Sequence, residues 1–170
     1  DDLLLATPEG AAVILGGEIG TMDAADADML LTAEGIATIA AADLDGDGYA
    51  DLVFGAPEVE GMESGDGLVF VTTNPTDGDD LTEGVLLVGE SAGAAAGAAL
   101  ATGDIDGNGT DDLLVGAPGT EEADGATGTV YAITEAPEGT MWLGEAGTAI
   151  LGSADGGGFG VGLSTADADG

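Results

Sequence analysis

The sequence predicts an all-β protein built from about three repeated units, each containing four short antiparallel strands. The first observation is a recurring stretch, which reads DLDGDGYADLVFGAP at 43–57 and DIDGNGTDDLLVGAP at 104–118. The second is its spacing: the aspartate that opens the stretch recurs after 61 and 63 residues, and the one that closes it recurs after 49 and 61. Such a period is typical of stacked or radially arranged supersecondary units, such as propeller blades.

Each unit holds four short apolar runs bounded by Gly, Pro, Asp or Asn, which is the pattern of β-strands. The first strand of the unit is expected at 36–42, 97–102 and 159–165, and the second at 3–6, 52–54 and 113–115. The third is expected at 12–15, 68–72 and 129–133, and the fourth at 29–32, 85–88 and 148–151. The Ala-rich stretch 92–101 also fits a helix, but Gly93 and Gly97 would each cost about 1 kcal/mol there. Its alignment with the neighbouring units favours a strand.

These units divide the chain into four segments. We expect a partial blade at 1–34, complete blades at 35–95 and 96–158, and the start of a further blade at 159–170. Two explanations remain open for a chain of just under three blades. It is an excerpt of a larger propeller, or its copies associate head to tail through exposed strand edges and an acidic loop split between two chains.

The composition is strongly acidic, with 34 Asp and Glu, no Lys, Arg or His, and a formal net charge of −34. Nucleic acid and anionic membrane surfaces are therefore disfavoured as partners, because no basic group can meet a phosphate, and we expect neither nucleic-acid binding nor membrane insertion. No apolar run approaches the roughly 20 residues of a membrane span. The 44% of hydrophobic residues predicts a folded core rather than disorder. Since His, Lys, Arg and Cys are absent, few groups could act as nucleophile or oxyanion donor, and we expect no catalysis.

The acidic stretch has the chemistry of a cation site. Positions are counted from Asp43 and Asp104, which open the two copies. Oxygen ligands at positions one, three, five, seven and nine could surround a hard cation, and a glycine at position six permits the left-handed backbone of such a curl. Ca²⁺ suits this set, whereas transition metals would need His or Cys. An EF-hand would carry Glu at position twelve, where this chain has Phe54 and Val115. A solvated turn without metal is the alternative, and two copies with the same spacing favour the cation. The predicted ligands are Asp43, Asp45, Asp47, Tyr49 (carbonyl) and Asp51; Asp104, Asp106, Asn108, Thr110 (carbonyl) and Asp112; and, in the split loop, Asp2, Asp167 and Asp169.

These loops, the Gly-Ala-Pro triplets that follow at 55–57 and 116–118, and the patterns GLVFV at 67–71 and GTVYA at 128–132 resemble the FG-GAP repeat of integrin α-subunit propellers and their bacterial and archaeal relatives. The Phe-Gly pair of that repeat is present only as Phe159-Gly160. Gly35-Ile36 and Ala96-Gly97 stand in its place elsewhere.

The resemblance implies a calcium-loaded β-propeller that is extracellular or on the cell surface. We expect a calcium-stabilised structural or adhesive module, with filament formation by head-to-tail association as one form of it. The alternative is a carbohydrate- or protein-binding propeller segment of a larger cell-surface protein or polysaccharide-active enzyme. Trp142 could stack on a sugar, although packing in the core or at a sheet edge is favoured for it.

Overall fold

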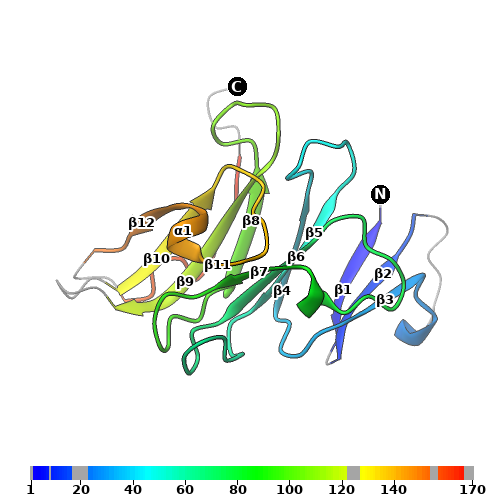
Figure 1. The fold of residues 1–170 in the computed structure, drawn as a ribbon, viewed down its shortest axis with the longest axis horizontal. Coiled ribbons are helices and arrows are strands. Elements are labelled where there is room, and N and C mark those ends of the chain that lie inside the picture. The colour runs from blue at the N-terminus through cyan, green and yellow to red at the C-terminus, as the bar shows by residue number, and fades with distance from the viewer. Residues whose placement is uncertain (1, 8, 17–22, 122–126, 154–156, 167–170) are drawn as a thin grey trace.

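The computed structural model describes residues 2–7, 9–16, 23–121, 127–153 and 157–166. Within these ranges the chain forms three sheets, which lie side by side in a row and do not close into a ring (Figure 1). The strands pair antiparallel except for β11 with β7, a further isolated bridge between Thr32 and Asp80 is parallel, and helix is confined to three short segments. The all-β class predicted from the repeats is confirmed, and the sheets have the form of propeller blades.

The first blade is a three-stranded sheet of β1 (Leu3–Thr7), β2 (Gly10–Ile14) and β3 (Met29–Thr32). Its order is β1-β2-β3, so β1 is an edge strand. A 3₁₀ turn, η1 (Ala24–Asp26), precedes β3, and the Asp23 side chain caps it by accepting a hydrogen bond from the Ala25 amide at 3.1 Å.

The second blade contains β4 (Thr38–Ala42), β5 (Asp51–Ala56), β6 (Leu68–Thr72) and β7 (Val85–Val88) as consecutive antiparallel neighbours. Val and Phe alternate along β6 in a strand buried on both faces, which is the pattern of a sheet enclosed between two others.

The third blade has the order β8-β9-β10-β12, from β8 (Ala99–Gly103), β9 (Asp112–Glu121), β10 (Thr127–Ile133) and β12 (Thr148–Leu151). Strand β9 continues through Pro118, well beyond the predicted run 113–115, because β10 pairs with it as far as Glu121 across a register irregularity. The other predicted strands of the three blades are found within a few residues of their expected bounds.

Four segments differ from the sequence prediction or were absent from it, one of them the 3₁₀ turn η1 already described. Residues 159–165 were expected to form a strand but lie in turns and irregular structure, since no described strand is available to pair with them. The stretch β11 (Thr140–Trp142) joins the second blade by pairing in parallel with β7, and the short helix α1 (Leu143–Ala146) follows it. The 3₁₀ turn η2 (Leu81–Glu83) precedes β7.

Strand β8 replaces the helix considered for the Ala-rich stretch, of which 92–98 forms turns. Trp142, at the end of β11, is half-buried and packs against the core between the first and second blades. Packing at a sheet edge, the interpretation that the sequence favoured for this tryptophan, is therefore what the structure shows.

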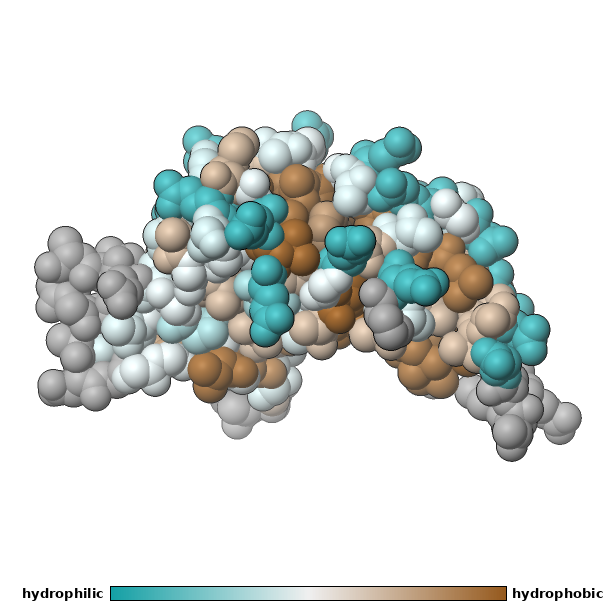
Figure 2. Space-filling model, turned by 90° about the horizontal axis from the view of Figure 1, so that it is seen from below, coloured by the Kyte–Doolittle hydropathy of each residue, from teal (hydrophilic) through white to brown (hydrophobic). Residues whose placement is uncertain are grey.

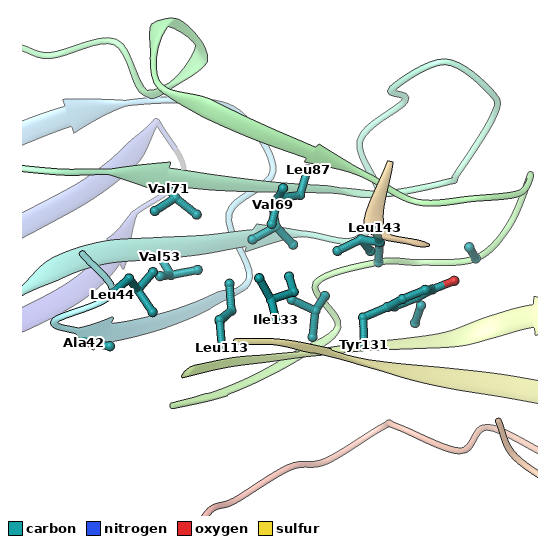
Figure 3. Close-up of a cluster of buried hydrophobic side chains, with 14 residues drawn as sticks. Ala42, Leu44, Val53, Val69, Val71, Leu87, Leu113, Tyr131, Ile133 and Leu143 are labelled. Atoms are coloured by element: carbon teal, nitrogen blue, oxygen red, sulfur yellow. The ribbon is translucent and has the colours of Figure 1, made fainter. Parts of the chain in front are cut away.

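A continuous apolar core lies between the second and third blades (Figure 3). Val53 and Val71 of the second blade are on one side of it, and Leu113 and Ile133 of the third are on the other. Leu44, from the loop between β4 and β5, is 6% exposed and belongs to the same cluster. Side chains point alternately to the two faces of a strand, so β5 packs against both neighbouring blades. Val53 packs toward the third blade, and the residues before and after it pack toward the first.

The first and second blades share a second core. Val13 and Leu31 of the first blade cluster with Leu52 and Phe54 of the second. At the molecular surface, hydrophilic side chains are interspersed with apolar patches (Figure 2).

Strands β4 and β8, the first strands of their blades, lie next to each other and are joined by hydroxyl hydrogen bonds. Thr38 Oγ1 donates to the Gly97 carbonyl at 2.6 Å, and Thr102 Oγ1 donates to the Ala41 carbonyl at 3.2 Å. A Cβ atom on Gly55 would lie 2.2 Å from the Gly97 oxygen. Glycine at the start of the Gly-Ala-Pro triplet therefore permits the close approach of two blades.

Candidate metal centre

The two acidic loops connect equivalent strands. Loop 1 (residues 43–51) joins β4 to β5, and loop 2 (residues 104–112) joins β8 to β9. The glycine at position six adopts the predicted left-handed backbone in both, with φ of +88° at Gly48 and +94° at Gly109. No atom outside the loop would meet a Cβ at either glycine, so backbone conformation rather than packing favours glycine there.

In loop 1 the aspartate side chains organise the curl by accepting hydrogen bonds from backbone amides. Asp43 Oδ2 accepts from the Gly48 amide at 3.0 Å. Asp45 Oδ1 accepts from the Asp47 amide at 3.1 Å, and Asp47 Oδ1 accepts from the Tyr49 amide at 2.8 Å. Each of these acids is thereby bonded to the amide two or five residues ahead in the chain, and Asp47 Oδ2 also accepts from Asn74 Nδ2 at 3.5 Å.

Loop 2 repeats these bonds and adds two, because Asp104 Oδ1 also accepts from the amides of Gly107 and Asn108 at 2.7 and 3.0 Å. Asp104 Oδ2 accepts from the Gly109 amide at 3.0 Å, and Asp106 Oδ1 accepts from the Asn108 amide at 2.9 Å. Asn108 Oδ1 accepts from the amide of Thr110 at 2.7 Å and from its hydroxyl at 2.6 Å. The side-chain oxygen of Asn108, at position five, therefore accepts the same backbone hydrogen bond that Asp47 accepts in loop 1.

The closing aspartates are buried at the start of β5 and β9. Asp51 is 2% exposed and accepts from the Leu44 amide at 3.0 Å; Asp112 is 0% exposed and accepts through Oδ2 from the Ile105 amide at 2.6 Å. Burial raises the pKa of Asp51 above its ordinary value, and the charges of Asp45 and Asp47 raise it further. Backbone hydrogen bonds lower this pKa, but the raising effects outweigh them. A negative charge at this position is thus disfavoured without a cation.

The carboxylates converge in both loops. Ligand oxygens of Asp43, Asp45 and Asp47 lie within 4.8 Å of one another in loop 1. Those of Asp104, Asp106 and Asp112 do so in loop 2, where the closing aspartate is part of the group. The structure thus brings together most of the predicted side-chain ligands. The carbonyls of Tyr49 and Thr110 stay predictions.

Two carboxylate oxygens in these loops are buried and have no hydrogen-bond partner in the described part of the chain: Asp43 Oδ1 and Asp112 Oδ1. An unpartnered buried oxygen costs about 1–3 kcal/mol, and more when it is charged. A divalent cation bound inside each loop would satisfy one of these two oxygens. The residues present therefore fit an oxygen-coordinated ion.

The predicted split loop has weaker support. Asp2 is exposed, accepts from the Gly16 amide at 2.6 Å, and belongs to no cluster of three acids in the described residues. Asp167 and Asp169 lie outside the residues that the structure describes.

The two loops also contact each other, which the sequence analysis did not predict. The Asp111 amide donates to the Asp43 carbonyl at 3.0 Å, and the Asp43 amide donates to Asp111 Oδ2 at 3.2 Å. Asp111 holds position eight of loop 2, where loop 1 has Ala50. This difference between the copies was the only signal in the sequence.

A third buried acid was also missed. Asp66 is 0% exposed and accepts hydrogen bonds from the amides of Gly61, Met62 and Glu63 at 2.7–2.8 Å. Its bonds all come from residues 61–63, and it belongs to no cluster of three acids in the described residues, so it organises the loop before β6.

The second and third blades each contain four antiparallel strands with an acidic loop between the first and second, which is the form of a β-propeller repeat. Two family models match the chain: the FG-GAP-like repeat over residues 1–54 and the FG-GAP repeat over residues 96–133. The chain is an FG-GAP repeat protein. A search of curated proteins finds no significant match. The helical segments in the described residues have three or four residues each, too few to span a membrane.

Proposed function

We propose that this chain is a non-catalytic structural module of an extracellular or cell-surface protein, and that loops 1 and 2 each bind one Ca²⁺. FG-GAP repeats are structural or binding modules that are generally non-catalytic and typically occur in surface proteins. The observation that carries the calcium assignment is the pair of unpartnered buried oxygens, Asp43 Oδ1 and Asp112 Oδ1, inside loops with matching hydrogen bonds.

The ion would be held by side-chain oxygens of the loops. In loop 1 these come from Asp43, Asp45, Asp47 and Asp51, and in loop 2 from Asp104, Asp106, Asn108 and Asp112, with the carbonyls of Tyr49 and Thr110 completing the sets. Ca²⁺ accepts 6–8 oxygen ligands in flexible geometry, whereas Mg²⁺ demands a near-ideal octahedron and keeps several waters. The number of protein oxygens gathered here favours Ca²⁺.

The mechanical role of the ion would be to join strands. Each loop closes a hairpin between the first and second strand of a blade, and loop 1 contacts loop 2 through Asp43 and Asp111. An ion in each loop would neutralise the acids that otherwise repel one another, and would fix two hairpins and the junction between two blades. Such a clamp is valuable in a chain that has no basic side chain to form an ion pair.

The test is a calcium titration by calorimetry after removal of metal with a chelator. We expect two saturable sites per chain, weaker binding of Mg²⁺, and loss of both sites in the double variant Asp43→Asn/Asp104→Asn. The matched control is Asp26→Asn/Glu58→Gln, which removes the same charge at exposed positions outside the loops. Absence of saturable calcium binding, or equal loss in the control, would contradict the proposal.

The alternative role in carbohydrate or protein binding stays a prediction. Its specific candidate was Trp142 as a stacking platform, and that ring is half-buried against the core between the first and second blades. We therefore propose no ligand site at this residue.

A further inference from the structure

Asp111, the eighth residue of loop 2, is bonded to loop 1 rather than to its own loop. Its Oδ2 accepts a hydrogen bond from the Asp43 amide at 3.2 Å, and its amide donates to the Asp43 carbonyl at 3.0 Å. In the described part of the chain its carboxylate accepts no hydrogen bond from another residue of loop 2. Asp111 is half-buried, so this pair of bonds is partly shielded from water.

The curl of an acidic loop does not require an acid at position eight. Loop 1 has the exposed Ala50 there, and its glycine at position six adopts nearly the same backbone conformation as that of loop 2. Asp111 therefore has no evident role in shaping loop 2. What its carboxylate does is hold a residue of the neighbouring blade.

The residue that it holds, Asp43, needs support. Asp43 opens loop 1, and its ligand oxygen lies within 4.8 Å of those of Asp45 and Asp47, so the three charges repel one another without a cation. Asp43 Oδ2 accepts from the Gly48 amide, while Oδ1 is buried without a partner among the described residues. Because Asp111 bonds both the amide and the carbonyl of Asp43, it fixes the backbone from which this ligand projects.

The contact extends to the closing aspartates of both loops. Leu44, the residue after Asp43, donates its amide to Asp51 Oδ2 at 3.0 Å. Asp112, the residue after Asp111, is 0% exposed, and its Oδ1 has no partner among the described residues. The buried closing aspartates of the two loops are thus linked through chain neighbours and the hydrogen bonds between Asp43 and Asp111.

Further contacts hold the two loops against each other. A Cβ atom on Gly46 would lie 3.0 Å from Thr110 Cγ2, so position four of loop 1 is next to position seven of loop 2. In the strands that lead into the loops, Thr102 Oγ1 donates to the Ala41 carbonyl at 3.2 Å. Asp111 therefore meets Asp43 from a fixed part of the neighbouring blade.

We propose that Asp111, although it belongs to loop 2, is a positioning residue for the cation of loop 1. The proposal deepens the calcium binding proposed above and rests on it, because it names a residue outside loop 1 on which the affinity of loop 1 depends. By holding Asp43 in place before the ion arrives, Asp111 reduces the cost of ordering the ligands when the ion binds.

The test measures each loop separately. In the background Asp104→Asn/Asp106→Asn, loop 2 loses two carboxylates and loop 1 is the site that is titrated. The background Asp45→Asn/Asp47→Asn does the reverse. Asparagine keeps an acceptor oxygen in each place, so the backbone hydrogen bonds of the disabled loop can be retained. Calcium is titrated by calorimetry in about 1 M salt, where the Debye length is about 3 Å and distant charges contribute little.

Each background then carries Asp111→Ala or Asp111→Asn. Both changes remove the same charge, but only asparagine retains an oxygen that can accept the Asp43 amide. Alanine is the residue that loop 1 itself has at this position, so the variant should fold. Comparing the two variants therefore separates the hydrogen bond from the charge.

With loop 1 as the site, Asp111→Ala should bind calcium about three- to tenfold more weakly than Asp111→Asn, which is the effect of one net hydrogen bond. With loop 2 as the site, the two variants should agree within about twofold, because the carboxylate of Asp111 accepts no bond from that loop. Hydrogen exchange gives a second measurement. In the calcium-saturated chain, the Asp43 amide should exchange faster in Asp111→Ala than in Asp111→Asn.

Equal affinities of the alanine and asparagine variants at loop 1 would overturn the proposal, because they would show that only the charge of Asp111 matters. A loss of the same size at both loops would also overturn it, since it would indicate a general weakening of the junction. Absence of saturable binding in the parent chain and in both backgrounds would be a different result, because it would reject the calcium assignment itself.

Discussion

Replacing Asp112 by asparagine tests the coupling between cation binding and blade stability most directly. This residue is 0% exposed, and Oδ2 accepts hydrogen bonds from the amides of Ile105 and Asp106 at 2.6 and 3.2 Å. Its Oδ1 has no partner among the described residues, and Asp112 belongs to the acidic group of loop 2. Asparagine keeps the shape and one oxygen but removes the charge.

With calcium present, the variant should lose affinity at loop 2. A divalent ion about 2.4 Å from a carboxylate oxygen gains about 3 kcal/mol from that charge even with the dielectric constant of water. The retained amide oxygen recovers part of this, so we expect a fall of about 10- to 100-fold in affinity, or about 1.4–2.8 kcal/mol. At saturating calcium this corresponds to a decrease of about 3–10 °C in the melting temperature.

Without calcium, the same change should act in the opposite direction. Two unit charges 4.8 Å apart, the limiting separation in this group, repel by about 1 kcal/mol at the dielectric constant of water and about 3 kcal/mol at an effective value of about 20. Removing the charge of Asp112 relieves its repulsion with Asp104 and Asp106. The chelated variant should therefore melt at the same temperature as the chelated parent, or above it.

The assay is a pair of thermal melts, with excess calcium and with chelator, for the parent, Asp112→Asn and the control Glu58→Gln. The control removes one charge at an exposed position of the second blade. Calorimetric titration should find one strong site in Asp112→Asn and two in the control. An equal loss of stability with and without calcium would refute the reasoning, because it would show that Asp112 acts only through its backbone hydrogen bonds.

Three further predictions concern the junctions and one surface turn. Leu44→Ala should lower the unfolding free energy by about 2–4 kcal/mol in chemical denaturation. Ile105 holds the same loop position but is 48% exposed, so Ile105→Ala should lower it by less than about 1 kcal/mol. Equal losses in the two variants would contradict the packing argument. Gly55→Ala should cost about 1–3 kcal/mol in the same assay, because its Cβ would overlap the adjacent blade's backbone; an unchanged midpoint would speak against that close approach. Hydrogen bonds from the hydroxyl and then the amide of Thr82 lower the pKa of Asp80 below its ordinary value, so Thr82→Val should raise that pKa in a carbon-13 titration. The lowered pKa of Asp80 stabilises the fold at pH values above the pKa that Asp80 has in the unfolded chain. This contribution is lost as the pH falls through the lower pKa that Asp80 has in the folded chain.

Much of the fold could be predicted from the sequence because strand boundaries and turns are local properties. Runs such as 68–72 and 85–88 are delimited by residues that punctuate strands, and the structure has β6 and β7 at these bounds. The left-handed glycines of the loops, Gly48 and Gly109, were predictable for the same reason: the curl needs a conformation that glycine adopts freely.

Contacts between segments distant in the chain were not predictable. Residues 140–142 form β11 by pairing with the edge of β7, and residues 159–165 form no strand because no described strand pairs with them. The bond between Asp111 and Asp43 depends on how two blades meet. None of these depends on residue type alone.

The sequence by itself determined the repeat, the strand pattern and the acidic loops, since each follows from residue types at fixed local spacing. Only the tertiary structure decided which oxygens are buried without a partner, which strands have both neighbours, and which apolar side chains remain exposed. The physical reason is that burial and pairing depend on the chain around a residue in space. Leu3 and Leu52 hold the same place in the repeat, yet one is 37% exposed and the other 5%.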